Sequence, residues 1–296
     1  MKIAITGASG LVGQALSESL KKDGHMVLPI SRSSGDDIVC WNPEAGTIEK
    51  EKLHGCDAIV NLAGEGIAQR WTSEVKRRIL DSRIKSTRLI AETAASLEPK
   101  PKALINASAI GIYGYKKREA VDEDSSYGTG FLADVCKEWE PQTNAAEDAG
   151  IRVAQIRIGI VLSPKGGALA KMITPFKAGV GGPVGNGKQI ASWIALDDLV
   201  HVFRLAIEND SVSGVINAVA PNPVSNREFA TVLGQVLGRP SLVPAPAIAV
   251  KLAFGEMAAE TVLSDLEVKS RRLPELGFEF QYPTLPEALK YLLVCG

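Results

Sequence analysis

The chain has 296 residues, 45% of them hydrophobic and 23% charged, with a formal net charge of -1; such a chain can bury a sizeable core. This balance offers no basic field for nucleic acid and no polybasic face for an anionic membrane, so the expected partner is a small molecule. No signal-peptide pattern follows Met1 and no apolar run approaches the roughly 20 residues that span a bilayer, which predicts a cytoplasmic protein.

Predicted strands and helices alternate over about the first 160 residues. Residues 2–6 form an apolar run that leads into glycine, as a buried parallel strand does, and residues 11–22 place apolar side chains on one helical face. A strand over 26–30 completes the first strand-helix-strand unit. Further strands are predicted over 56–62, 103–107 and 152–161, and further helices over 73–96 and 131–149. This alternation predicts an α/β protein with a doubly wound parallel sheet.

Glycines mark the turn between the first strand and its helix. Gly7, Gly10 and Gly13 have the spacing G-x-x-G-x-x-G, and such glycines let the backbone turn tightly and approach a pyrophosphate at the helix N-terminus. The second strand ends at Ser31 and Arg32, where an NAD-selective site would offer a carboxylate to the ribose 2′-hydroxyl. A hydroxyl and an arginine suit a 2′-phosphate instead. The sequence therefore predicts a Rossmann-type site that favours NADP.

Several further motifs follow in order along the chain. They are Asn61-Leu-Ala-Gly-Glu65, Asp81-Ser-Arg83, Ser108-Ala-Ile-Gly-Ile-Tyr-Gly114, Trp139-Glu140 and Gly181-Gly-Pro-Val-Gly-Asn-Gly187. With the glycine turn, they resemble extended short-chain dehydrogenase/reductases and, more narrowly, the "epimerase family" proteins of the atypical group, once labelled cell-division inhibitors. The resemblance covers essentially the whole chain, and the part from Pro221 onward looks like that family's own C-terminal domain.

Composition changes at Ser163, where a stretch rich in glycine and proline runs to Gly187. This stretch is either a lid over a bound ligand or a connector between domains. A strand and helix resume over 193–206, a strand follows near Gly214, and the chain beyond is mainly helical. We expect two domains, an NADP-binding Rossmann domain and a smaller, mainly helical substrate domain. The first comprises residues 1–162 and 192–222, and the second residues 163–191 and 223–296.

The resemblance implies which residues hold the cofactor. The glycine turn would bind the pyrophosphate, the end of the second strand the 2′-phosphate, residues 62–64 the adenosine side, and the backbone near Val161 the nicotinamide. Arg83, on the helix after the third strand, either reaches the cofactor phosphates or is an ordinary surface arginine. The complete expected set is Gly7, Ser9, Gly10, Leu11, Val12, Ser31, Arg32, Leu62, Ala63, Gly64, Arg83 and Val161.

The chain departs from the catalytic pattern of short-chain dehydrogenases. Those enzymes use Tyr-x-x-x-Lys on one helical face, where the lysine lowers the tyrosine pKa for proton exchange. Here the candidate lysine, Lys137, has Ala133 four residues earlier, and the predicted helix from Phe131 to Trp139 lacks tyrosine. Ser108 and Tyr113 are the remaining catalytic candidates, a hydroxyl for a substrate carbonyl and a phenol in place of the missing acid.

Other expectations concern metals, partners and the kind of function. The four cysteines and three histidines lack the spacing of a metal site, so no metal is expected. A homodimer could form through the helices over 73–96 and 131–149. Two classes of function stay open: an NADP-dependent oxidoreductase or nucleotide-sugar epimerase-like enzyme of unknown substrate, and a non-catalytic NADP-binding sensor or scaffold.

Overall fold

The computed structural model describes residues 1–116 and 119–295, and an eight-stranded sheet lies at its centre. In spatial order the strands are β11 (Gly214–Ala218), β7 (Arg152–Ile158), β6 (Ala103–Ala109), β5 (Ala58–Asn61), β1 (Lys2–Thr6), β2 (Met26–Ser31), β3 (Val39–Asn42) and β4 (Thr47–Ile48). All neighbours are parallel except β3 and β4. The strand order reverses at β1, which lies between β2 and β5. Doubly wound sheets bind ligands at such a point, outside the carboxyl ends of the strands.

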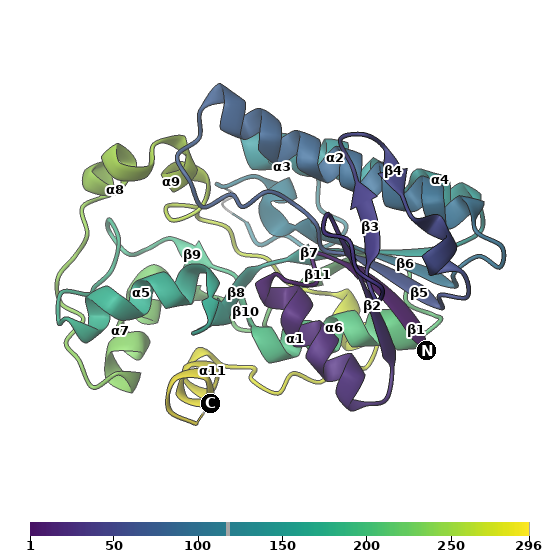
Figure 1. Ribbon diagram of the computed structural model, residues 1–296. Coiled ribbons are helices and arrows are strands. Elements are labelled where there is room, and N and C mark those ends of the chain that lie inside the picture. The colour runs from purple at the N-terminus through teal and green to yellow at the C-terminus, as the bar shows by residue number, and fades with distance from the viewer. Residues whose placement is uncertain (117–118, 296) are drawn as a thin grey trace.

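Helices cover both faces of this sheet (Figure 1). α1 (Leu11–Lys22) and α6 (Leu196–Glu208) lie on one face, and α2 (Ser73–Ser96), α3 (Phe131–Trp139) and α4 (Asn144–Asp148) lie on the other. The central strands are mainly apolar because successive side chains enter two different covered cores. The doubly wound fold expected from the sequence is therefore confirmed.

Two predicted elements are interrupted, each for a local reason. The helix expected over 131–149 divides into α3, the 3-10 turn η3 (Glu140–Thr143) and α4, because Pro141 lacks the amide proton that would continue the helix. The strand expected over 152–161 divides at Gly159 into β7 and β8 (Ile160–Ser163). A side chain at Gly159 would lie 2.8 Å from the Ser192 carbonyl, so this crossing needs glycine. The short strands β3 and β4 were not predicted.

The chain beyond β7 builds a second lobe beside the carboxyl edge of the sheet (Figure 1). There β8 pairs with β10 (Trp193–Ala195), outside the main sheet, whereas α6 and β11 pack with the main sheet. The lobe core gathers around Trp193 and the helices α5, α7 and α11. The remaining elements are α5 (Gly167–Lys177), β9 (Ile190–Ala191), β12 (Val224–Ser225), α7 (Asn226–Val236), α8 (Ala247–Phe254), α9 (Glu256–Glu260), α10 (Arg272–Glu275), α11 (Leu285–Lys290), the π-helical turn η4 (Tyr291–Cys295) and the 3-10 turns η1 (Lys50–Leu53) and η2 (Ile110–Tyr113).

Two features are absent from the described residues. None of their helices is both long and apolar enough to cross a membrane. Within the same residues, no group of three or more histidine, cysteine, aspartate and glutamate side chains is arranged to hold a metal ion.

Candidate functional site

The glycine turn packs the start of α1 directly against the strands at the switch point. Gly7 has φ of +65°, a conformation that favours glycine, and a Cβ there would lie 2.8 Å from the Leu62 carbonyl oxygen. A Cβ on Gly13 would overlap the Gly7 carbonyl oxygen. Gly10 caps α1 without a side-chain hydrogen bond, so the first amides of the helix remain available to a ligand. This cradle fits a pyrophosphate, which the positive end of the helix dipole favours.

The other predicted residues of this turn lie around the cradle. Ser9 is exposed beside Gly10, whereas Leu11 and Val12 are partly buried and pack against the core under the sheet. The Leu11 side chain also faces the second lobe, since Cβ atoms built on Gly166 and Gly167 would lie 3.5 and 3.7 Å from it. Val161 belongs to β8, which leads into this glycine pair. Leu11 and the end of β8 therefore border the same opening between sheet and lobe.

The end of β2 carries the two residues expected at the 2′-phosphate. Ser31 is its last residue, and its hydroxyl oxygen accepts a hydrogen bond from the Ser33 amide at 3.2 Å. Arg32 is exposed, and its guanidinium makes no hydrogen bond or ion pair with the part of the chain that the structure describes. A free cation therefore stands where the sequence places the 2′-phosphate.

The loop after β5 is tied to β1 by a threonine. The Thr6 hydroxyl donates to Asn61 Oδ1 at 2.7 Å and accepts from the amides of Leu62 and Ala63 at 3.0 and 3.1 Å. This arrangement holds the residues expected on the adenosine side, including Gly64, at a fixed position beside the glycine turn.

Arg83 forms part of the wall behind this loop. Its guanidinium carbon would lie 3.2 Å from a Cβ on Gly64 and lies 5.1 Å from the centre of the Trp139 ring. Nη1 donates to the backbone carbonyls of Glu65 and Ile79 at 3.1 and 3.0 Å. Burial lowers the pKa of the guanidinium. The interpretation of Arg83 as an ordinary surface arginine is therefore wrong, because the side chain packs against Gly64.

The two candidate catalytic residues lie in a buried polar network beneath the ends of β6, β7 and β11. Ser108 Oγ donates to Glu140 Oε1 at 2.6 Å. Arg157 holds the same carboxylate through Nε and Nη2, both at 2.8 Å, and donates from Nη1 to the Tyr113 hydroxyl at 2.8 Å. The Tyr113 hydroxyl donates to Asn217 Oδ1 at 2.9 Å. We call these five side chains the buried network.

Burial sets the electrostatics of this network. Ser108 is 3% exposed, and Tyr113 is fully buried. Burial raises the pKa of Tyr113, although the neighbouring Arg157 opposes the shift. Burial alone would lower the pKa of Arg157, but its hydrogen bonds to Glu140 leave that pKa raised. The two candidate hydroxyl groups thus donate their protons to protein acceptors, and neither reaches the surface of the opening.

The helix α3 turns an apolar and a sulfur group toward the end of β6 and the turn after it. Lys137 lies on its outer side, where Nζ pairs with Asp134 at 3.1 Å. The residues that face the end of β6 and the turn after it are Leu132, whose Cβ would lie 3.2 Å from a Cβ on Gly111, and Cys136, whose Sγ lies 3.8 Å from the Ala109 carbonyl. Burial raises the pKa of Cys136 to about 11, so its thiol is neutral at ordinary pH.

Sequence reasoning missed Glu140, Arg157 and Asn217 as members of the site. A signal was present, because Arg157 and Asn217 interrupt runs that otherwise read as buried strands. A charged side chain inside such a strand needs a partner at the same depth. Which partner it has depends on the packing of η3, whose position follows from the break at Pro141.

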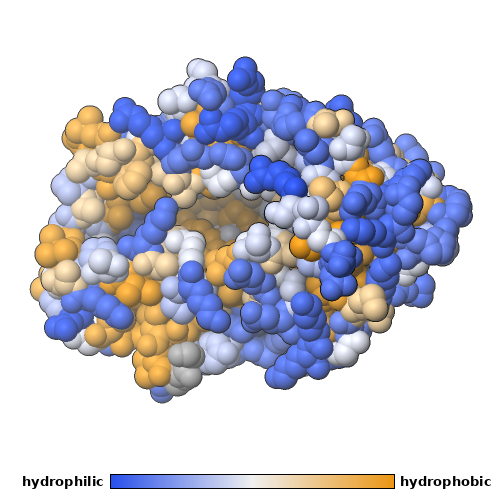
Figure 2. Space-filling view, in the orientation of Figure 1, coloured by the Kyte–Doolittle hydropathy of each residue, from blue (hydrophilic) through white to orange (hydrophobic). Residues whose placement is uncertain are grey.

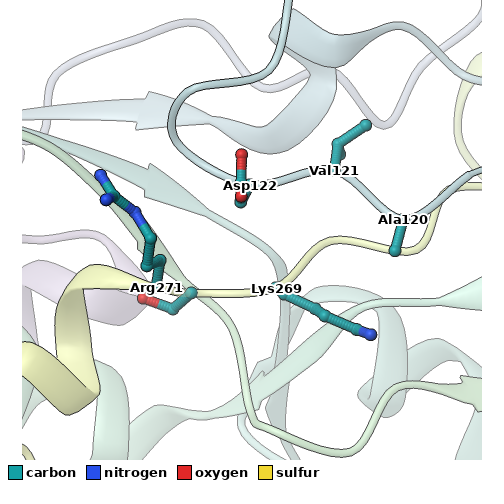
Figure 3. A pocket seen from close by; sticks show the side chains of 6 residues that line it. Ala120, Val121, Asp122, Lys269 and Arg271 are labelled. Carbon is teal, nitrogen blue, oxygen red and sulfur yellow. The ribbon is translucent and has the colours of Figure 1, made fainter.

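A separate surface pocket, of about 250 Å³, lies between residues 120–122 and 269–271 (Figure 3). The side chains of Lys269 and Arg271 point away from each other there. Arg271 also pairs with Asp124 at 2.9 Å. No set of polar groups converges on this pocket in Figure 3, so it is not the candidate site.

Comparison with known proteins supports the fold and the lineage. Residues 3–218 match the model of the NAD dependent epimerase/dehydratase family, and residues 245–292 match a domain of unknown function, DUF1731. Epimerase family protein Mb2239 of Mycobacterium bovis is 42% identical over 292 residues, which cover 98% of this chain and 96% of that protein.

Two solved structures show how far the likeness extends. The crystal structure of human epimerase family protein SDR39U1 with NADPH is 34% identical, has a TM-score of 0.93, and each chain covers 99% of the other. UDP-glucose 4-epimerase of Thermotoga maritima shares the fold with a TM-score of 0.78 at 18% identity, covering 99% of this chain and 97% of that one. This chain therefore belongs to the NAD dependent epimerase/dehydratase family and carries the epimerase family C-terminal domain of unknown function.

Proposed function

We propose that this chain binds NADP(H) and acts as an NADP(H)-dependent oxidoreductase or epimerase-like protein on a small molecule. The observation that carries the proposal is the glycine cradle at the uncapped start of α1 together with the free guanidinium of Arg32 at the end of β2. An arginine fork suits a phosphate better than a ribose hydroxyl. The crystal structure of the human relative with NADPH supports the same choice of cofactor.

Each part of the site has a role in this proposal. The free amides of Leu11 and Val12 at the start of α1 would hold the pyrophosphate, against a turn that the hydrogen bond from the Gly10 amide to the Gly7 carbonyl closes. Ser31 and Arg32 would hold the 2′-phosphate, and the loop at 62–64 would line the adenosine side. Val161 borders the nicotinamide through its backbone, and Arg83 stiffens the wall at Gly64. When bound, the nicotinamide supplies or accepts a hydride.

The residues of this chain shape the site rather than exchange a proton with the substrate. Ser108 and Tyr113 keep their protons within the buried network, and the thiol of Cys136 is neutral and buried. A proton needed by the substrate therefore comes from water in this proposal. The same observation favours a second candidate function, a non-catalytic NADP(H) sensor, since α3 turns Leu132 and Cys136, and neither a tyrosine nor Lys137, toward the end of β6 and the turn after it.

The first test is titration of the purified chain with NADPH and with NADH, repeated on Arg32→Ala. Loss of a charge-assisted contact of about 1.5–3 kcal/mol should weaken NADPH binding roughly 10- to 100-fold and leave NADH binding unchanged. The matched control is Arg77→Ala, an exposed arginine on α2. Absence of dinucleotide binding, or equal losses for both cofactors, would contradict the proposal.

Oxidation of NADPH separates the two candidate functions. If a broad set of carbonyl compounds gives turnover in the wild-type chain, the oxidoreductase reading holds, and Ser108→Ala should then change stability more than turnover. Tight NADPH binding without turnover on any of them supports the sensor.

A further inference from the structure

Several apolar side chains from separate parts of the chain remain only partly covered near the carboxyl edge of the sheet. Leu11 and Val161 come from the core under the sheet, Ile110 from the turn after β6, and Leu132 from α3. All four are only partly buried. Figure 2 shows a hollow in the middle of this face, with an apolar floor, and we call this hollow the compartment. Leu11 lies beside the glycine pair after β8, and Leu132 lies beside Gly111 in the turn after β6, so incompletely covered apolar groups occur on both sides of the carboxyl edge of the sheet.

Two arginines of the sheet region already have partners within the protein. Arg83 donates to the carbonyls of Glu65 and Ile79, and Arg157 holds Glu140. Recognition of a diphosphate normally uses free arginine or lysine side chains. Arg157 cannot supply such a contact without leaving the buried carboxylate of Glu140 unpaired, and Nη1 of Arg83 is already bonded to two backbone carbonyls.

The free amides at the N-terminus of α3 also have partners within the protein. The backbone amides of Phe131 and Leu132, which could otherwise bind an anion, donate to Oε1 and Oε2 of Glu260 at 2.9 Å each. Glu260 belongs to α9 of the second lobe and is itself buried. A carboxylate of the protein therefore stands at the helix end where the phosphate of a nucleotide could have been held.

The helix α8 adds an apolar surface beside the hollow. Of its eight residues only Lys251 is polar, and none is buried. Ile248 and Leu252, one helical turn apart, are each 73% exposed. In Figure 2 apolar residues cover the upper left of this face, where α8 and α9 lie in Figure 1, and extend toward the hollow.

Both ends of α8 are anchored, although its side chains are not. Before the helix, Ala245 exchanges backbone hydrogen bonds with Pro183 and Gly185 at 2.9 and 2.8 Å. After it, Glu256 accepts from Lys76 Nζ at 2.6 Å, and α9 packs into a core with α2 and α3. The helix is thus held in place at the edge of the compartment with its apolar side chains uncovered.

We propose that the compartment binds an uncharged, largely apolar small molecule, which α8 partly covers, and that it does not bind a nucleotide-linked sugar. This inference rests on the proposed function, because it names the substrate class for the same site. Its support is the partly covered apolar side chains near the carboxyl edge of the sheet, the internal pairing of Arg83 and Arg157, the Glu260 cap on α3, and the uncovered face of α8.

The test uses binding rather than turnover. The full chain, with and without saturating NADPH, is titrated with 2-butanone, 2-hexanone, 2-octanone and UDP-glucose by ligand-observed NMR. Burial of each methylene should strengthen binding about fourfold, so affinity should rise steeply along the ketone series. UDP-glucose should bind more weakly than 2-octanone. Equal affinities for the three ketones would overturn the inference. So would tighter binding of UDP-glucose than of 2-octanone.

Two variants test whether α8 contributes to the binding of 2-octanone. Leu252→Asp should weaken the binding of 2-octanone at least about tenfold, because a carboxylate would replace the apolar contact. Met26→Asp is the matched control, because Met26 is 63% exposed at the start of β2, on the opposite edge of the sheet, and should leave binding unchanged. Equal effects of the two variants would count against α8 as a wall of the compartment.

NADPH binding is measured on every variant, which separates the two proposals. One outcome is that NADPH fails to bind, while the affinity for the ketones still rises with chain length and still depends on Leu252. In that case the proposed function is wrong and the apolar compartment is supported. If NADPH binds and the ketones do not, the cofactor proposal stands and the substrate class is overturned.

Discussion

The two halves of the sheet's carboxyl edge use their polar groups in opposite ways. At the ends of β1 and β2, the amides that begin α1 have no side-chain cap and the guanidinium of Arg32 is exposed. At the ends of β6, β7 and β11, the polar side chains point inward and satisfy one another through Arg157 and Glu140. One half is open to a ligand, and the other is closed by its own contacts.

This difference separates cofactor binding from proton chemistry. A buried arginine must keep its carboxylate, because an unpaired charge at that depth is costly. Ser108 and Tyr113 belong to that arrangement, so their hydroxyl groups cannot be redirected to a substrate without breaking it. The open half is thus free to bind a dinucleotide, and the closed half provides a rigid floor. Three predictions test this comparison, from the largest expected effect to the smallest.

Removal of one charge from the closed half should have the largest effect. Glu140→Gln leaves Arg157 without its anionic partner, and breaking a buried pair in this way costs about 3–5 kcal/mol. The free energy of unfolding from urea denaturation measures it. Glu138→Gln, an exposed neighbour on α3, is the control and should change stability by less than about 0.5 kcal/mol. A loss below about 1 kcal/mol in Glu140→Gln would show that the network does not depend on the charge pair.

The thiol of Cys136 should make stability fall in alkaline solution. Its pKa is raised from 9.0 to about 11 by burial. The unfolded chain therefore loses this proton first, so the contribution is fully present below pH 9 and is lost as the pH rises through about 11. Two pH units correspond to about 2–3 kcal/mol.

The comparison of variants isolates this contribution. The difference in unfolding free energy between pH 9 and pH 11 should shrink in Cys136→Ala and stay in Cys40→Ala, whose thiol is only partly buried. An unchanged difference in Cys136→Ala would mean that the thiol is not shielded from solvent on the closed side.

Removal of the Tyr113 hydroxyl should have the smallest of the three effects. Tyr113→Phe leaves Arg157 Nη1 and Asn217 Oδ1 without this partner, a loss of about 2 kcal/mol, while the affinity for NADPH should stay within about twofold of the wild type. Tyr127→Phe is the control, because this residue is 54% exposed and its hydroxyl accepts only a long hydrogen bond, 3.5 Å, from Arg157 Nη2. Lost NADPH-dependent turnover at unchanged stability would instead make Tyr113 a catalytic residue.

The open half, at the ends of β1 and β2, could be predicted from the sequence because its motifs are short and lie within neighbouring elements. Gly7 and Gly10 lie between a strand and a helix, Gly13 lies in the first turn of that helix, and Ser31-Arg32 stand at the next strand end. The parallel order of the strands brings these short motifs to one edge of the sheet. The helix predicted over 73–96 has the bounds of α2, since Thr72 caps its first turn by accepting from the Val75 amide.

The closed half could not be predicted in the same way, because its contacts join distant segments. Tyr113 meets Asn217 across 104 positions of sequence, and the start of α3 meets Glu260 across 129. No spacing rule connects such pairs. The break at Pro141 was readable in the sequence, but its consequence, the carboxylate of Glu140 beneath β6 and β7, depends on how η3 packs.

The sequence by itself determined the doubly wound sheet, the glycine turn and the lineage of this chain, because these depend on periodicity and on residues close together along the chain. Only the tertiary structure decided that Ser108 and Tyr113 are buried donors in a charged network, that Arg83 packs against Gly64, and that α8 stands uncovered beside the hollow. The reason is physical: whether a polar group is free or paired, and whether an apolar side chain is covered, is set by neighbours that only folding brings together.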